Sequence, residues 1–350
     1  MMLMQIFSLL RRFPSAASSL ACMLAVVICC VPSRAQQKTE TKTTTTTAQA
    51  NAAQPKLTRT TTRHEVRRVP YGSTVTLLGA PVGSITIEAW SRPEIDITAD
   101  IELRADTEED LTRLATVNSF VIDDEPNHLR ILTTGMHDKK FMRRAAKDFP
   151  KKLLGLPWKI DYRLRVPTLT DLEINGGRGA FNLTGVEGNI SFQAQESDAA
   201  LTLSGGALRV TLLRGSVKLN IAARSWRGAG ANVQLAAGDI TLELPAGFSG
   251  DVDADILRTG QIENNNAELT PRERTIPTPR STKSRAGAGG TTFALTVGDG
   301  TIRLTKAEVR SQNQKRKSEP GSQKSEDKTA TRFYSALPSS CSSVLLTPKP

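Results

Sequence analysis

Three aspartates at alternate positions come closest, among the residues of this chain, to a known chemical site. Asp251, Asp253 and Asp255 match the spacing of the first carboxylates in an EF-hand calcium loop. Such a loop needs Gly at its sixth position and a bidentate Glu at its twelfth, where this chain has Ile256 and Ile262. The apolar residues between the aspartates instead predict the solvent face of a strand. No metal site is therefore predicted, and the three aspartates remain a weak metal candidate.

The histidines offer no catalytic or metal-binding arrangement. His64, His128 and His137 fall in a linker, before a strand and in a loop, and none stands beside a nucleophile or at zinc-ligand spacing. The glycines precede strands rather than helices, so they do not form a phosphate-binding loop. The sequence therefore predicts no catalytic residue, no cofactor and no enzyme.

One tryptophan is a candidate contact residue. Trp226 lies between Arg224 and a Gly-rich run, at a corner rather than in a strand. An exposed Trp at a corner can stack on a sugar or anchor a partner. A buried Trp at the same place caps the end of a core, and this second interpretation is favoured because aromatics are only 5% of the chain.

A basic insertion at residues 136–159 raises the question of membrane contact. Residues 139–149 predict a basic amphipathic helix with Met142, Ala146, Phe149 and Leu153 on one side, which can lie on anionic lipid. The favoured alternative is a helix that packs this apolar stripe on the body of the protein while its Lys and Arg face water.

The elements that position these residues are mostly short strands. Nine segments repeat a small residue followed by alternating apolar positions, which predicts strands with one buried face. They span residues 83–87, 179–183, 188–192, 199–203, 206–210, 215–219, 231–235, 238–242 and 300–304. One such unit cannot bury its apolar face alone, so stacking into a β-solenoid is favoured over an antiparallel sandwich.

The N-terminal part of the body predicts longer elements. Strands are expected at 95–103, 120–122, 129–132 and 160–166, and one short helix is expected after the N-cap Thr107. Residues 271–290, rich in Pro, Arg and Gly, predict a mobile surface excursion.

Both ends of the chain have the composition of segments outside a folded body. Residues 1–35 predict a cleaved secretory signal, 36–65 a disordered Thr-rich linker, 66–305 the folded body and 306–350 a disordered basic tail. Three of the four cysteines fall in the signal, which leaves Cys341 without an intramolecular partner. We therefore expect an exported protein without disulfides, located in the periplasm, at the cell surface or outside the cell.

The net charge of +11 resides mainly in the linker, the insertion, the excursion and the tail. The strand-bearing remainder is acidic. This distribution argues against a nucleic-acid groove and allows weak contact with an anionic membrane surface.

The order of these features resembles the bacterial putative-adhesin domain, a group of exported proteins of unknown function. The resemblance covers residues 70–304 and is carried by residues 83–87, 162–167 and 298–302 together with the Gly-containing strands between them. It implies a right-handed β-solenoid-like body. The basic insertion and the excursion at 271–290 depart from that pattern, and no catalytic residue is carried over.

The function expected from these features is that of an exported, non-enzymatic scaffold with an adhesin-like role. Strand faces and corners would contact an unknown protein or glycan at the cell envelope. Two alternatives stay open: a carbohydrate-active lyase or hydrolase on a β-helix, and a membrane-tethered sensor or accessory domain. The oligomeric state is not indicated by the sequence.

Overall fold

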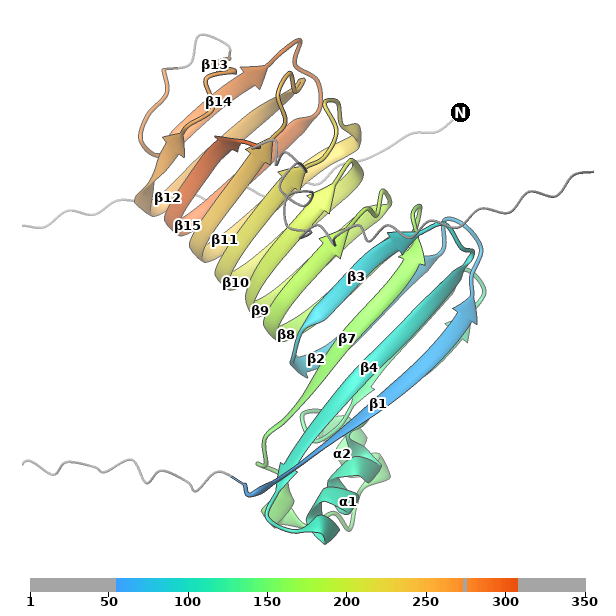
Figure 1. The fold of residues 1–350 in the computed structure, drawn as a ribbon. Coiled ribbons are helices and arrows are strands. Elements are labelled where there is room, and N and C mark those ends of the chain that lie inside the picture. Colours follow the sequence, from blue (N-terminus) through green and yellow to red (C-terminus); the bar gives the residue numbers. More distant parts are fainter. Residues whose placement is uncertain (1–54, 273–275, 308–350) are drawn as a thin grey trace, which may run out of the picture. The chain divides into compact units, whose positions relative to one another are not determined.

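The computed structural model describes residues 55–272 and 276–307, which fall within one compact unit that begins at Ala53. This unit is all-β, and its fifteen strands belong to one open sheet (Figure 1). The strands are β1 (Leu57–Arg68), β2 (Thr74–Val82), β3 (Ile85–Trp90), β4 (Glu94–Ala105), β5 (Ser119–Glu125), β6 (His128–Thr134), β7 (Trp158–Pro167), β8 (Asp171–Thr184), β9 (Asn189–Leu203), β10 (Gly205–Ile221), β11 (Arg227–Leu244), β12 (Gly250–Asn264), β13 (Leu269–Pro271), β14 (Ser281–Ala286) and β15 (Thr292–Lys306). The helices are α1 (Glu108–Val117), α2 (Lys139–Ala145) and the single 3-10 turn η1 (Lys151–Leu153).

Six of the strands form an unbroken run of parallel pairs. Their order is β8, β9, β10, β11, β15 and β12, so the last described strand of the chain is inserted between β11 and β12. The register is continuous, because Val210 lies beside Phe192 on one side and Val233 on the other. Apolar residues therefore fall beside apolar residues along the whole run.

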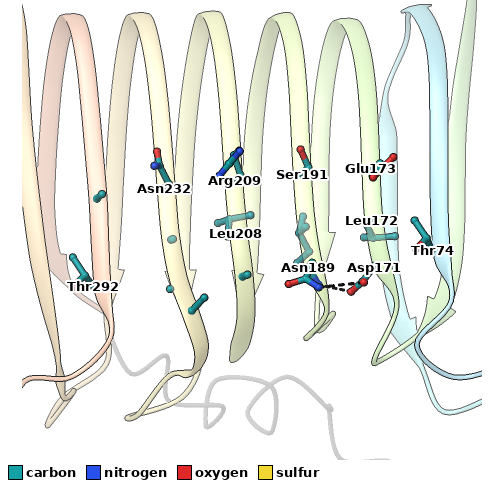
Figure 2. A pocket seen from close by; sticks show the side chains of 16 residues that line it. Thr74, Asp171, Leu172, Glu173, Asn189, Ser191, Leu208, Arg209, Asn232 and Thr292 are labelled. Carbon is teal, nitrogen blue, oxygen red and sulfur yellow. Dashed lines mark hydrogen bonds between the residues drawn. The ribbon is translucent and has the colours of Figure 1, made fainter. Parts of the chain in front are cut away.

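Each long strand of this run turns at a small residue near its middle. In β10 the buried side chains fall at even positions from Leu208 to Leu212 and at odd positions from Val217 to Ile221. Side chains alternate strictly along a straight strand, so this change of phase requires the chain to turn near Gly215. Figure 2 shows the stacked ribbons arching over in the same way. Two segments that the sequence predicts as separate strands are thus the two halves of one bent strand.

Stacked glycines make this turn possible. Gly238 has φ 136°, and a Cβ added there would lie 1.8 Å from the carbonyl oxygen of Gly215. A Cβ on Gly300, the next residue in the column, would lie 1.8 Å from the oxygen of Gly238. Only glycine combines this backbone conformation with so close an approach of the next strand.

The core lies under both halves of the bent strands and continues into the N-terminal part. Its largest fully buried side chains include Tyr162, Phe181, Phe192 and Phe293. The rings of Phe181 and Phe192, on the neighbouring strands β8 and β9, stack with their centroids 3.9 Å apart. The two residues are not in register but come from opposite halves of the bent strands, so their rings meet across the core and stabilise the stack.

The N-terminal part joins the parallel run to an antiparallel sheet. β1, β4 and β7 pair antiparallel, while β3 pairs in parallel with both β7 and β8. The strands predicted at 95–103, 120–122, 129–132 and 160–166 are all confirmed, as β4, β5, β6 and β7. The predicted helix is confirmed as α1, whose N-cap Thr107 accepts a hydrogen bond from Asp110 N at 3.2 Å.

Three predictions about segment boundaries are wrong. A disordered linker through residue 65 is contradicted by β1, which pairs with β4 from Leu57 to Arg68. A mobile excursion at 271–290 is contradicted by β14, which pairs with β12 and β13. The expected total of one short helix is too low, because α2 forms as well, begins after the N-cap Asp138 and lies where both interpretations of the basic insertion place a helix. β1 and β14 form because each pairs with a neighbouring strand. The composition of each segment alone does not predict a strand.

The predicted signal, the stretch 36–54 of the linker and nearly all of the predicted tail lie outside the described residues. Among the residues that are described, no helix is long and apolar enough to cross a membrane.

Candidate binding groove

A shallow groove of about 640 Å³ crosses the outward face of the parallel run, near the beginnings of its strands (Figure 2). The residues that line it come from β2, β8, β9, β10, β11 and β15. Because the strands are in register, the outward side chains form rows across them. One row is Glu173, Ser191, Arg209, Asn232 and Ala294.

Small residues make this part of the face hollow. Ala207 and Gly230 lie side by side in the register of β10 and β11, one row before Arg209. With at most a methyl group at these positions, the backbone of the two strands forms the floor of the groove. The longer side chains of the next row form its wall.

Two carboxylates at one end of the groove are held by internal hydrogen bonds. Asp171 Oδ1 accepts from the backbone N of Asn189 at 2.7 Å, and its Oδ2 accepts from Asn189 Nδ2 at 3.2 Å (Figure 2). Glu173 Oε2 accepts from Thr76 Oγ1 at 3.2 Å. These bonds fix the side chains in place and leave the second oxygen of Glu173 as an acceptor.

Arg209 is the basic side chain that lines the groove. It is exposed, and within the described part of the chain it makes no hydrogen bond or ion pair. Its neighbour Asn232 accepts from Gln234 Nε2 at 3.2 Å, which leaves the amide NH₂ of Asn232 as a donor. The middle of the groove thus presents a guanidinium fork and an amide, both suited to a polar ligand.

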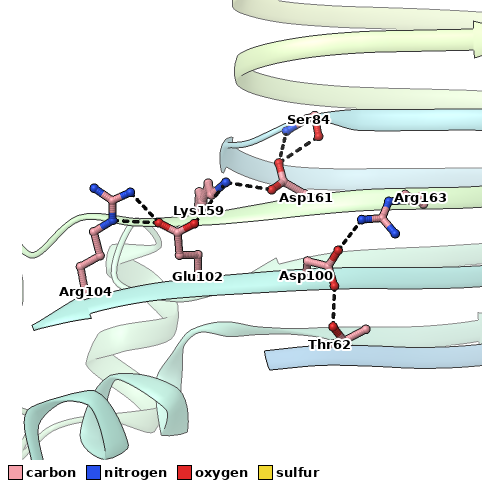
Figure 3. Close-up of polar contacts among 8 residues, drawn as sticks. All are labelled: Thr62, Ser84, Asp100, Glu102, Arg104, Lys159, Asp161 and Arg163. Atoms are coloured by element: carbon pink, nitrogen blue, oxygen red, sulfur yellow. Dashed lines mark hydrogen bonds and ion pairs between the residues drawn. The ribbon is translucent and has the colours of Figure 1, made fainter. Parts of the chain in front are cut away.

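On the outer face of β1, β4 and β7, unlike in the groove, the charged side chains form ion pairs and neutralise each other (Figure 3). Lys159 Nζ lies 3.2 Å from both Glu102 and Asp161. Arg163 lies 2.6 Å from Asp100, which also accepts from the hydroxyl of Thr62 at 2.6 Å.

The pKa of Glu102 shows the same self-neutralisation. A hydrogen bond from Arg104 and a weaker one from Lys159 hold this pKa below its usual value, against the opposing effect of burial. This face therefore has fewer uncommitted groups for a ligand than the groove has.

The three aspartates of the weak metal candidate lie in a different environment from the one predicted. Asp251 is 5% exposed, and its carboxylate lies 2.8 Å from Arg285 and 2.9 Å from Arg272. Arg272 also contacts Asp253 at 2.9 Å, while Asp255 accepts from Ser281 Oγ at 2.6 Å. The predicted solvent face of the strand is wrong, because β14 and Arg272 cover it.

Arginines neutralise two of these carboxylates, those of Asp251 and Asp253. Hydrogen bonds from Arg285 and then Arg272 hold the pKa of Asp251 below its usual value. Across the described residues, no group of three or more His, Cys, Asp or Glu side chains is placed to hold a metal. The aspartates therefore join β12 to β14 and to the segment that follows β13.

Trp226 is buried, so the exposed position considered from the sequence is wrong. Its side chain is 7% exposed, its Nε1 donates to Gly206 O at 2.9 Å, and its ring meets Phe293 edge-on at 5.2 Å. The corner in which it lies turns the indole inward. The residue completes the core and does not offer a contact surface.

The three histidines each interact with a different partner. His64 Nε2 lies 2.7 Å from Asp96, His128 Nε2 lies 2.8 Å from Thr76 Oγ1, and His137 packs on Trp158 with centroids 5.5 Å apart. The structure does not bring them together.

The apolar stripe of the basic insertion packs on the body. Met142 and Leu153 are buried, and Phe149 lies against the core cluster. Arg143 and Arg144 of α2 are exposed. The stripe is therefore not available to a lipid surface, in agreement with the favoured interpretation of the sequence.

The groove itself was not predicted from the sequence. Its outward positions can be recognised as strand residues, but their meeting in one row depends on the register. The available signal was the pair of small residues, Ala207 and Gly230, at outward positions of neighbouring strands.

Known proteins were compared with this chain at three levels. No family model matches the chain, and no curated protein matches it. Solved structures do. A putative cell adhesion protein from Clostridium sporogenes is 12% identical, with a TM-score of 0.37, over 71% of this chain and 100% of that one.

Two further structures are similar. A putative adhesin from Bacteroides fragilis is 12% identical with a TM-score of 0.25, over 72% of this chain and 99% of that one. A putative lipid binding protein from Parabacteroides distasonis is 9% identical with a TM-score of 0.18, over 71% and 97%. These similarities confirm the resemblance to the adhesin family. Because the TM-scores are low, nothing about the groove is inferred from these structures.

Proposed function

We propose that this chain is an exported, non-enzymatic interaction protein of the cell envelope that binds a partner along the groove. The partner is a glycan or an extended protein segment rich in hydroxyl and amide groups. The observation that carries the proposal is Arg209, an exposed guanidinium without a partner in the described residues, set above a floor of Ala207 and Gly230.

The body that presents the groove is, in this proposal, a right-handed β-solenoid. Five consecutive parallel pairings, from β8 to β12, support this architecture over an antiparallel sandwich. The column of glycines at the strand bends supports it too, since each bend stacks on the next. A solenoid repeats its outward positions at the strand spacing of about 4.8 Å, which suits a partner that lies extended across the strands.

The chemistry of the groove favours binding over turnover. Carbohydrate-active enzymes need a converging acid and base, and here Asp171 and Glu173 each hold an internal hydrogen bond. The remaining groups are amides, hydroxyls and one guanidinium, which recognise hydroxyl and carboxylate groups by hydrogen bonding.

The test is binding of the purified protein to an array of glycans and of extended peptides. Arg209→Ala and Asn232→Ala should each weaken capture of the best ligand about tenfold, because each removes a charged or polar contact. Lys218→Ala is the matched control, since Lys218 is exposed on the other half of β10 and pairs with Glu243 at 2.8 Å. It should bind like the unmodified protein.

Two outcomes would overturn the proposal. One is equal capture of the ligand by the Arg209→Ala variant and the unmodified protein. The other is hydrolysis or elimination of the bound glycan that Glu173→Gln abolishes, which would make the groove an active site.

A further inference from the structure

Two large, exposed apolar side chains lie on adjoining loops at one end of the strands. Tyr71, in the loop between β1 and β2, is 62% exposed, and Leu169, in the loop between β7 and β8, is 55% exposed. Gly72 N donates to Leu169 O at 3.0 Å, so the two loops touch. A single exposed apolar residue is ordinary on a protein surface, but an adjacent pair at loop tips marks a contact site.

Hydrogen bonds between the loops stabilise this arrangement. The third loop, between β3 and β4, joins the first, because Val69 N donates to Pro93 O at 3.2 Å and Tyr71 Oη donates to Ser91 O at 3.4 Å. These bonds hold the phenol ring of Tyr71 across two loops and outside the core. The exposure of the pair is therefore built into the fold.

Basic side chains flank the same loops. A hollow of about 550 Å³ lies between the first and third loops and is lined by Arg68, Val69, Pro70, Arg92, Pro93 and Glu94. Arg92 lies over the ring of Trp90 at 5.2 Å and reaches Glu94 at 3.4 Å, while its side chain stays 68% exposed. Arg68 makes no hydrogen bond or ion pair within the described residues. With two guanidinium groups and one carboxylate, the hollow carries a net positive charge.

We propose that this tip, formed by Tyr71, Leu169, Arg68 and Arg92, docks on the surface of a bilayer that contains anionic phospholipid. Tyrosine is enriched at the headgroup level of membranes, and a neighbouring leucine reaches the edge of the acyl region. Arg68 and Arg92 bind headgroup phosphates, for which the planar guanidinium is suited. The tip is separate from the groove, so this contact does not depend on the proposed ligand.

A lipid surface fits the tip better than a protein partner does. The tip offers two apolar side chains and a net positive charge, which is little for the apolar centre of a stable protein interface. Reversible attachment to a membrane needs only a small apolar insertion combined with electrostatic attraction. Two other exposed leucines do not form such a pair, because Leu213 and Leu257 lie on β10 and β12, which are not neighbours in the sheet.

The experiment is co-sedimentation of the full chain with vesicles. One set contains phosphatidylglycerol and phosphatidylcholine, and the other contains phosphatidylcholine alone. We expect the protein to sediment with the vesicles that contain phosphatidylglycerol and to bind vesicles of phosphatidylcholine alone at least tenfold more weakly. Binding to the phosphatidylglycerol vesicles should decrease as the salt concentration rises.

Variants test whether vesicle binding depends on the tip or on another part of the chain. Tyr71→Ser with Leu169→Ser, and separately Arg68→Gln with Arg92→Gln, should each weaken vesicle binding at least fivefold. The matched control, Leu213→Ser with Leu257→Ser, removes two exposed leucines elsewhere and should bind like the unmodified protein. Thermal melting of each variant shows that it is folded.

Vesicle binding by the folded Tyr71/Leu169 variant that equals that of the unmodified protein would overturn the proposal. So would the absence of sedimentation with anionic vesicles at low salt. Neither result bears on the groove, which the glycan and peptide arrays test separately.

Discussion

At the scale of single residues, the bends of β10, β11 and β15 depend on the absence of a Cβ atom at one glycine in each strand. Gly215, Gly238 and Gly300 all have positive φ, and each lies against the carbonyl oxygen of the preceding residue in the column. The residues after the bends add polar contacts between strands. Asp198 Oδ1 accepts from Ser216 Oγ at 2.6 Å, and Asp239 Oδ1 accepts from Thr301 N at 3.0 Å.

Gly238→Ala should therefore damage the fold severely. The new Cβ would lie 1.8 Å from the backbone oxygen of Gly215, at φ 136°, so neither the neighbour nor the residue itself can relax cheaply. We expect a loss of about 4 kcal/mol or more in the free energy of unfolding, measured by urea denaturation, or failure to fold.

Gly155→Ala is the control for this substitution. A Cβ at Gly155 meets nothing within 4 Å, so its unfolding free energy should change by less than about 1 kcal/mol. Equal midpoints for the two variants would show that the glycine column does not support the stack.

At the scale of elements, β14 is held on β12 by charge as well as by pairing. The Asp251 carboxylate, 5% exposed, contacts Arg285 and Arg272, and these two lower its pKa. A folded pKa below the unfolded one means that the unfolded chain takes up the proton first as the pH falls. The stabilisation is then complete above the ordinary Asp value of about 3.9 and declines as the pH falls through the folded value.

Asp251→Asn should lower the free energy of unfolding at pH 7 by about 2 to 3 kcal/mol, because two arginines lose their shared charged partner. The free energy of unfolding should be measured by urea denaturation at each pH. The difference in this free energy between the variant and the unmodified protein should shrink as the pH falls from 5 to 2. Glu109→Gln is the control, since its exposed pair with Arg113 on α1 contributes less than about 0.5 kcal/mol. A difference that stays constant with pH would contradict the assigned ion pairs.

The elements that the sequence predicts well are those with local signals. Thr107 followed by three acids marks the beginning of α1, and alternation marks β4 and β7, because capping and period are properties of neighbouring residues. The sequence does not predict β1 and β14, because neither segment has alternating large apolar residues. They are strands because β4 and β12 offer them backbone partners.

The groove could not be predicted for a related reason. Ala294 joins the row of Arg209 and Asn232 only because β15 is inserted beside β11, and such strand order depends on long-range pairing. The burial of Asp251 beneath Arg272 is equally non-local. Alternation alone places that carboxylate in solvent, whereas a strand from another part of the chain covers it.

At the scale of the whole unit, an open sheet must protect its edges. One edge is β1, which carries Arg59, Arg63, Arg67 and Arg68, and charged edge strands resist pairing with another chain. Another edge is the three-residue β13, beyond β14. β14 and β13 thus cover β12, the end of the parallel run, which would otherwise present unpaired backbone groups.

Ser284→Pro should uncover that end and cause self-association. Lys283 O accepts from Arg272 N at 2.8 Å, so alternation turns the backbone of Ser284 toward β12, where proline cannot donate. We expect the variant to keep its β-sheet circular dichroism and to gain concentration-dependent mass in sedimentation velocity, as β12 pairs with another copy. Ser284→Ala, which keeps the backbone donor and loses only the hydroxyl, should sediment like the unmodified protein. If the proline variant stays folded and its mass does not rise with concentration, β14 does not protect this edge.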